Sequence, residues 1–182
     1  METNNPELIY EQNREKTRVL ITGSVSGIAE LVIHTLDFTG TEADYILENG
    51  MQNIQGNDFL ILENHNISEV GNFQPIVVLI ANETPSENYT DLLNKIVSGG
   101  ILIYDESDEN LKSALSETTN YFRRIPYKKT DISNGLINTE FGEIPVSVTD
   151  EKIIPHIEGV RLLCQQFRIM EEEFYESLMS FR

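Results

Sequence analysis

Two glycines and two serines form the stretch whose residue types could bind a phosphate group: Gly23, Ser24, Ser26 and Gly27. An apolar, β-prone run precedes them and apolar residues at helical spacing follow, which predicts a strand, a turn and a helix. In phosphate-binding loops, backbone N–H groups and the helix N-terminus surround the anion, and a lysine after the second glycine reaches the outer phosphates. Here Ile28 follows the second glycine. We therefore interpret this stretch as a degenerate nucleotide-binding loop that serves as a strand-to-helix turn.

Polar residues also stand at the ends of two strongly apolar runs. Glu63 closes the first run, and Asn82 follows the second. Such runs are typical of parallel strands buried on both faces, and ligand sites in open α/β sheets lie at the carboxyl ends of these strands. We therefore expect Gly23, Glu63 and Asn82 to meet around one crevice. Glu63 and His65 could hold a metal ion there, although two ligands make a poor site and a remnant loop is the simpler interpretation.

The composition excludes several classes of partner. The 182 residues include 30 acids and 13 Lys and Arg, a formal net charge of −17. Such a charge repels nucleic acid phosphates and anionic lipid surfaces, so we expect neither nucleic acid nor a membrane as a partner. The sequence shows no secretory signal and no apolar run of membrane length, and we expect a cytoplasmic protein. The single cysteine, Cys164, excludes a disulfide within one chain.

Strands and helices alternate along most of the chain, which predicts an α/β fold with a mostly parallel sheet. Residues 1–16 form a polar N-terminal arm in this interpretation, and residues 17–182 form a single domain. Beyond residue 120 the pattern changes to short strands around the turn Asn134-Gly135, which predicts an antiparallel extension. The expected strands are 18–22, 43–47, 58–63, 74–81, 101–104, 121–125, 131–138 and 144–148, and the expected later helices are 107–115, 154–167 and 171–181.

One helix start is marked by three residues at characteristic spacing. Thr84 is suited to the N-cap, Pro85 to the first helical position, and Glu87 to the third position of a capping box. We therefore expect a helix that begins at this point and ends at the glycine pair 99–100.

The order of these features and the wording of several segments resemble the central domain of the Mur ligases. These are ATP-dependent enzymes that join amino acids or peptides to UDP-N-acetylmuramate. The resemblance covers roughly residues 17–182, and the most similar branch attaches the recycled murein tripeptide or adds alanine. It is carried by HTLDFTGTEADYIL, DFLILE, NKIVSGGILIYDESDENLKSA, YFRRIPY and EGVRLLCQQFRIMEEEFYESLMSF. It implies a three-layer, Rossmann-like domain of phosphate-loop topology with helices on both faces of the sheet, and ATP and Mg²⁺ as ligands.

The sequence departs from the family pattern at four places that serve one reaction. The loop lacks its lysine, and Ile28 and Ala29 stand where side chains toward magnesium are expected. Glu63 matches the family's magnesium-binding glutamate, but residues 64–66 replace the acids that follow it. The histidine-bearing loop after the next strand is missing, and residues 150–153 replace the motif before the terminal helices. We therefore expect a truncated, degenerate form of this domain without the family's flanking domains.

These departures predict a non-catalytic homologue that binds no cofactor and acts as a binding or interaction module linked to peptidoglycan precursor metabolism. The expected partner is a second copy of the chain, a Mur ligase or another cell-wall enzyme. The alternative is a residual ATP- and Mg²⁺-dependent enzyme of the Mur ligase type that uses the crevice at Gly23–Gly27, Glu63 and Asn82. Such an enzyme needs a cation from elsewhere in the chain, such as Arg123 or Lys128.

Overall fold

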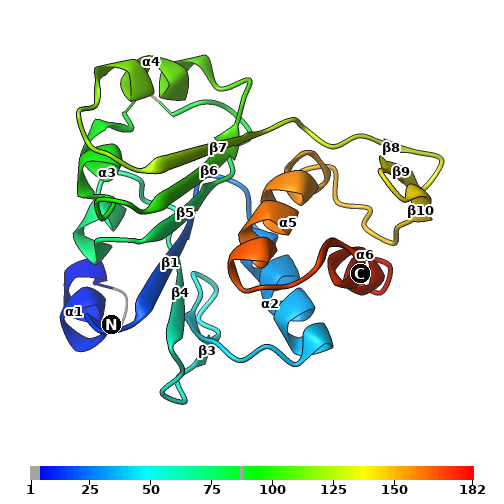
Figure 1. Ribbon diagram of the computed structural model, residues 1–182, viewed down its shortest axis with the longest axis horizontal. Helices are drawn as coiled ribbons and strands as arrows, with labels where there is room; N and C mark the ends of the chain where they lie inside the picture. Colours follow the sequence, from blue (N-terminus) through cyan, green and yellow to red (C-terminus); the bar gives the residue numbers. More distant parts are fainter. Residues whose placement is uncertain (1–4, 87) are drawn as a thin grey trace.

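A seven-stranded sheet forms the centre of the computed structural model, which describes residues 5–86 and 88–182 (Figure 1). Its strands are β1 (Thr17–Thr22), β2 (Asp44–Ile46), β3 (Gln52–Asn53), β4 (Phe59–Glu63), β5 (Val77–Ile80), β6 (Ile101–Asp105) and β7 (Arg123–Tyr127). Their spatial order is β3-β2-β4-β1-β5-β6-β7. All neighbouring pairs are parallel except β2 with β3. The predicted mostly parallel α/β sheet is confirmed.

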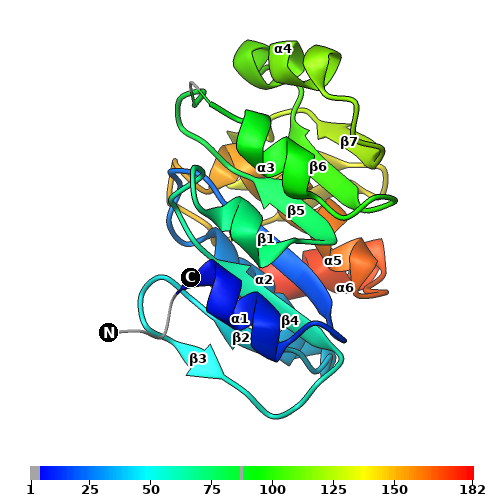
Figure 2. The ribbon, with the colours of Figure 1, turned by 90° about the vertical axis from the view of Figure 1, so that its left-hand side faces the viewer.

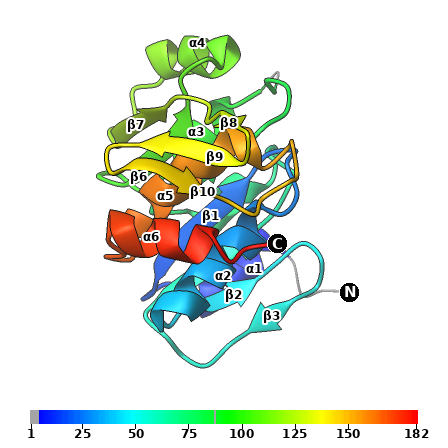
Figure 3. The same ribbon diagram turned by 90° about the vertical axis from the view of Figure 1, so that its right-hand side faces the viewer.

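Helices cover both faces of this sheet. One face carries α2 (Ile28–Thr39), the 3₁₀ turn η2 (Ile154–His156), α5 (Ile157–Gln166) and α6 (Glu171–Leu178), as Figure 3 shows. The other face carries α1 (Pro6–Gln12), η1 (Val70–Phe73), α3 (Thr90–Lys95) and α4 (Glu109–Glu117), which Figure 2 shows from the front. Successive β1 residues alternate between the two apolar cores, since Val19 and Ile21 belong to one and Leu20 to the other. The expected three-layer arrangement is therefore confirmed.

A small antiparallel sheet lies beside α5 and α6 (Figures 1 and 3). It contains β8 (Ile132–Ser133), β9 (Leu136–Thr139) and β10 (Gly142–Pro145), in the order β10-β9-β8. The turn between β8 and β9 is Asn134-Gly135, with φ values of 52° and 73°. Positive φ at both central residues matches the twist of a tight hairpin, so the predicted hairpin is confirmed. The last strand begins two residues earlier than expected.

The polar stretch at the start of the chain contains a helix. Asn5 caps α1 by accepting hydrogen bonds from the amides of Glu7 and Leu8, and Pro6 occupies its first position. Ile9 is buried in the core between the central sheet and the helices α1, α3 and α4, whereas Leu8 remains 45% exposed. The interpretation of these residues as an arm did not include this helix, because only Pro6 and Ile9 are buried and they leave a weak apolar pattern.

The capping-box prediction is wrong, because α3 begins at Thr90 rather than at Pro85. Glu87 lies outside the described residues. The physical reason is the buried Tyr89 hydroxyl, which donates to Asp108 Oδ2 at 2.5 Å and accepts from the amide of Ser86 at 3.0 Å. This hydroxyl therefore ties Ser86 to Tyr89, and Thr84 is the N-cap of none of the helices in the described part of the chain.

Candidate functional site

The loop between β1 and α2 is folded tightly against the end of β5. Gly23 has φ 120°, and a Cβ placed there would lie 2.0 Å from the carbonyl oxygen of Ala81. The amide of Val25 donates to the same carbonyl at 3.2 Å. Only glycine fits this close approach of two backbones, which explains its position in the sequence. The loop thus has the strand-turn-helix form expected from the sequence.

Asn82 meets the loop, as expected, and occupies one of its hydrogen-bond donors. Its Oδ1 accepts from the amide of Ser24 at 2.9 Å, while its Nδ2 donates to the Tyr89 hydroxyl at 2.8 Å. The Ser24 hydroxyl in turn accepts from the amide of Glu83 at 3.0 Å. In a phosphate-binding loop, such backbone donors point at the anion. Here groups of the chain itself take the place of that ligand.

An apolar side chain covers the second glycine of the loop. Gly27 is the N-cap of α2 with φ 87°, and a Cβ placed there would lie 2.6 Å from Cδ1 of Ile153. Ile153 is buried at 4% exposure, just before η2. Ile28, which stands where the lysine is expected, is fully buried in the core. Ser26 remains exposed. Hydrocarbon therefore lies against one side of the N-terminus of α2, where an anion would need polar contacts.

Glu63 and His65 lie side by side at the end of β4. Glu63 is 3% exposed; its Oε2 accepts from the amide of Glu48 at 3.1 Å, and its Oε1 lies 3.7 Å from Nε2 of His65. His65 Nδ1 lies 2.6 Å from the carbonyl oxygen of Gly23 and must donate to it, because a carbonyl only accepts. Burial raises the pKa of Glu63, and the nearby Glu30 carboxylate adds to the rise.

These two side chains alone do not make a complete metal site. Protein metal sites usually take at least three protein ligands, and this pair offers two. His65 already uses one ring nitrogen on the loop. Among the described residues, no three His, Cys, Asp or Glu side chains are grouped as metal ligands would be. With Ile28 and Ala29 in place of hydroxyl side chains and no lysine in the loop, the residues around it do not form a complete site for Mg²⁺ with a nucleotide.

Neither residue expected to replace the missing lysine is seen against the loop. Arg123 is the first residue of β7 and so lies at the start of a parallel strand, whereas the loop follows the end of β1. Lys128 is exposed beyond the end of β7. Lys152 instead stands next to the loop, with its Nζ 2.8 Å from Oε1 of Glu83. Sequence reasoning missed Lys152 and Ile153 as neighbours of the loop. The signal that could have found them was their place in the segment where the family motif is lost.

A buried tyrosine at the end of β7 and a buried histidine in η2 contact each other near this loop. The Tyr127 hydroxyl lies 2.7 Å from Nδ1 of His156 and 3.3 Å from the carbonyl oxygen of Ile80. Burial lowers the pKa of His156 to about 4, so the ring is neutral at pH 7. A cavity of about 180 Å³ remains beside them, lined partly by Asn82, Asp105 and Lys129. Lys129 lies 3.4 Å from Asp105, so this cavity also contains an internal ion pair.

Comparison with known proteins shows the fold. No family model and no curated protein matches the sequence. A UDP-N-acetylmuramate:L-alanyl-γ-D-glutamyl-meso-diaminopimelate ligase from Neisseria meningitides superposes with a TM-score of 0.76 at 10% identity, covering 97% of this chain and 70% of that chain. A murein peptide ligase from Psychrobacter arcticus gives 0.75 at 10% identity, covering 98% and 50%. MurF ligase from Thermotoga maritima, in complex with ADP, gives 0.66 at 12% identity, covering 97% and 51%.

The chain thus spans about half the length of two of these structures and 70% of the third. Within the described residues, no helix has the length and apolar character needed to cross a bilayer. Nearly the whole chain is used in each superposition, at identities too low to carry over an activity. The chain therefore has a Mur-ligase-like α/β fold.

Proposed function

We propose that this chain is a non-catalytic homologue of the Mur ligase central domain and acts as a binding module. The observation that carries the proposal is the loop itself, where Ile153 covers Gly27 and Asn82 occupies the amide of Ser24. Phosphoryl transfer depends almost wholly on positioned positive charge and metal around the phosphates. An isoleucine over the helix N-terminus and a buried Ile28 in place of the lysine supply neither.

A role in association is supported by apolar side chains outside the core. Phe141 and Met170 are 56% and 63% exposed, and both line one open groove. Large apolar side chains gathered on a surface are typical of contact sites between proteins. The similarity to murein ligases suggests a partner in cytoplasmic peptidoglycan precursor metabolism, either a second copy of this chain or a cell-wall enzyme such as a Mur ligase.

The nucleotide half of the proposal is tested by calorimetric titration of the purified chain with ATP and Mg²⁺. We expect no binding heat and no thermal shift at millimolar ATP, because the amide of Ser24 in the loop already donates to Asn82. The Glu63→Gln variant should behave in the same way. Micromolar binding that weakens in Glu63→Gln would overturn the proposal and support the alternative, a residual ATP- and Mg²⁺-dependent enzyme.

One observation favours that alternative enough to include it in the test. Lys152 is the cation beside the loop, held by Glu83, whose amide is bonded to Ser24. If the nucleotide competes for Lys152, removing its charge should abolish binding. The Lys152→Ala variant therefore belongs in the same titration, with Lys112→Ala on the exposed face of α4 as its matched control.

The association half is tested by sedimentation at several protein concentrations. If the groove mediates self-association, Phe141→Ser and Met170→Ser should shift the distribution toward monomer. Tyr121→Ser is the matched control, because Tyr121 is 77% exposed elsewhere on the molecule. A monomer at every concentration would exclude the homodimer. Titration of the chain against a purified Mur ligase, with the same variants, would then decide the remaining partner.

A further inference from the structure

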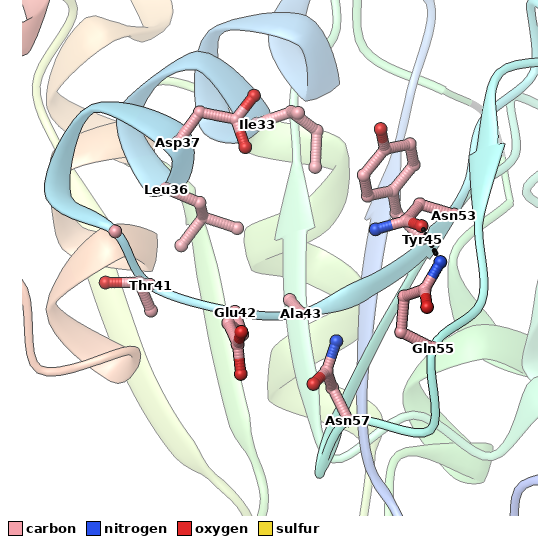
Figure 4. A pocket seen from close by; sticks show the side chains of 11 residues that line it. Ile33, Leu36, Asp37, Thr41, Glu42, Ala43, Tyr45, Asn53, Gln55 and Asn57 are labelled. Atoms are coloured by element: carbon pink, nitrogen blue, oxygen red, sulfur yellow. Dashed lines mark hydrogen bonds between the residues drawn. The ribbon is translucent and has the colours of Figure 1, made fainter.

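A second candidate site lies at the other end of the central sheet, where the parallel strands β2 and β4 begin. A cavity of about 400 Å³ opens between the C-terminal end of α2, β2 and the loop after β3. We call it the α2–β2 pocket, and its polar lining consists of the side chains of Asp37, Thr41, Glu42, Tyr45, Asn53, Gln55 and Asn57. Figure 4 shows these side chains around the space below the end of α2. The volume is within the range of small-molecule sites, about 300–1,000 Å³.

A buried carboxylate fixes one wall of this pocket. Asp44 is 0% exposed, and its Oδ1 accepts from the amides of Gln55 at 2.9 Å and Asn57 at 3.2 Å. Its Oδ2 accepts from the amide of Gly56 at 3.1 Å and from Lys16 Nζ at 2.5 Å. Burial alone would raise the pKa of Asp44, but these hydrogen bonds outweigh it and lower the pKa to about 2. The loop that presents Gln55 and Asn57 is therefore preorganised.

Several polar atoms in this wall remain available. Gln55 Nε2 donates a hydrogen bond to Asn53 Oδ1, and Asn57 Nδ2 donates one to Asp44 Oδ1. Within residues 5–86 and 88–182, no hydrogen bond engages Asn53 Nδ2, Gln55 Oε1, Asn57 Oδ1 or the Tyr45 hydroxyl. One amide donor, two amide acceptors and a phenol thus stand around one cavity without protein partners.

In a second polar cavity, some of the lining side chains are engaged by the chain itself. A cavity of about 590 Å³ between α1, η1 and α3 is lined by similar residue types. There Asn120 Nδ2 donates to the carbonyls of Leu93 and Ile96, and Asn72 accepts from Lys95. The ring of Tyr10 is covered by the guanidinium groups of Arg14 and Arg18. These three side chains of that cavity are therefore engaged internally.

The charge of the α2–β2 pocket restricts its ligand. Asp37 and Glu42 are both exposed at its rim, and neither Lys nor Arg is among its lining residues in the described chain. The C-terminal end of α2, capped by Gly40, adds the negative end of a helix dipole. Phosphate-bearing and carboxylate-bearing ligands are therefore repelled, and neutral or cationic ligands are favoured.

We propose that the α2–β2 pocket binds a saccharide ring that carries no phosphate, through the Tyr45 ring and the amides of Asn53, Gln55 and Asn57. Sugar hydroxyls both donate and accept hydrogen bonds, which matches amide donors, amide acceptors and carboxylates around one small space. The polarised C–H face of a sugar ring packs against an aromatic ring, whose face is negative. The pocket lies where the parallel strands begin and the loop at Gly23 lies where they end. The proposal can therefore be tested independently of the nucleotide site.

The proposal is tested by NMR titration of the ¹⁵N-labelled full chain with N-acetylglucosamine, glucosamine, glucose and glucose 6-phosphate. We expect the neutral and amino sugars to bind with millimolar affinity, with shifts at the backbone amides of residues 41–57, and glucose 6-phosphate to bind more weakly. Absence of shifts in this segment at tens of millimolar of all four sugars would overturn the proposal. Preference for the phosphorylated sugar would also overturn it.

Variants separate a binding role from a structural one. Gln55→Ala should weaken sugar binding by about 5-fold through loss of a hydrogen bond, and Tyr45→Leu should weaken it at least as much while keeping an apolar side chain. Asn94→Ala, in the second cavity, is the matched control and should leave the affinity unchanged. Asp37→Lys should strengthen binding of glucose 6-phosphate relative to glucose. Equal affinities in wild type, Gln55→Ala and Tyr45→Leu would place any binding outside this pocket.

Discussion

The two ends of the parallel strands in the central sheet differ in how their polar groups are hydrogen-bonded. We call the end where these strands finish the carboxyl edge and the end where they begin the amino edge. At the carboxyl edge, the amide of Ser24 bonds to Asn82, Ile153 lies against Gly27, and the Tyr127–His156 pair is buried. At the amino edge, the α2–β2 pocket keeps amide groups free, although a buried aspartate holds its loop in place. Around Gly23, at the end of the strands where ligand sites of open α/β sheets lie, groups of the chain itself occupy part of the loop.

The largest effect should come from adding one methyl group at the carboxyl edge. Gly23→Ala would place its Cβ 2.0 Å from a backbone carbonyl of the neighbouring strand, at φ 120°, and neither backbone can move away cheaply. We expect a loss of about 4 kcal/mol in the free energy of unfolding, from overpacking and backbone strain together. Urea denaturation monitored by circular dichroism measures this loss.

The matched control lies in the open pocket. Gly40 has φ 67°, but a Cβ placed there meets no atom within 4 Å. Gly40→Ala should therefore cost only the backbone strain, about 1 kcal/mol. Equal losses in the two variants would contradict the contrast between the two edges.

Removal of the Asp44 charge should have the next largest effect, and should affect the other edge. Asp44→Asn leaves Lys16 without its partner and turns one acceptor oxygen into a donor that faces backbone N–H groups. Loss of one member of a buried ion pair typically costs about 3 kcal/mol. Asp37→Asn is the control at the exposed rim of the same pocket, with an expected change within about 0.5 kcal/mol.

Hydrogen exchange localises this effect. In Asp44→Asn, the amides of Gln55, Gly56 and Asn57 should exchange faster, while Ser24 at the carboxyl edge keeps its protection. Uniformly faster exchange across the sheet would mean that Asp44 supports the whole fold and not this loop alone.

The sequence contained enough information to place the sheet but not the contacts at its carboxyl edge. Apolar runs ending in Glu63 and before Asn82 predicted two buried strands and their meeting with Gly23, because strand burial is a local pattern. The cover over Gly27 comes from Ile153, more than a hundred residues away, and no local pattern pairs these two. The false helix start at Thr84 has the same origin, since Asp108 on a later element binds the Tyr89 hydroxyl.

Mild acid should weaken the two edges to different extents. His156 is buried and its pKa is lowered to about 4 from an ordinary value near 6.5, so the unfolded chain binds its proton first as the pH falls. Its contribution to stability is therefore complete above pH 6.5 and is lost between pH 6.5 and 4. We expect the free energy of unfolding to fall by about 2 kcal/mol from pH 7 to pH 5 through this residue.

Asp44 responds in a lower range, because its pKa is lowered to about 2 and its stabilisation is lost only as the pH falls below its ordinary value near 4. The charged groups facing His156 are Asp105, Lys129 and Glu83. Urea denaturation of wild type and His156→Gln at both pH values isolates the histidine. The variant should be less stable at pH 7 and should lose about 2 kcal/mol less on acidification. If both proteins lose the same amount, the carboxyl edge does not depend on a neutral histidine, and Ile153 and the Gly23 contacts must hold it without help from this pair.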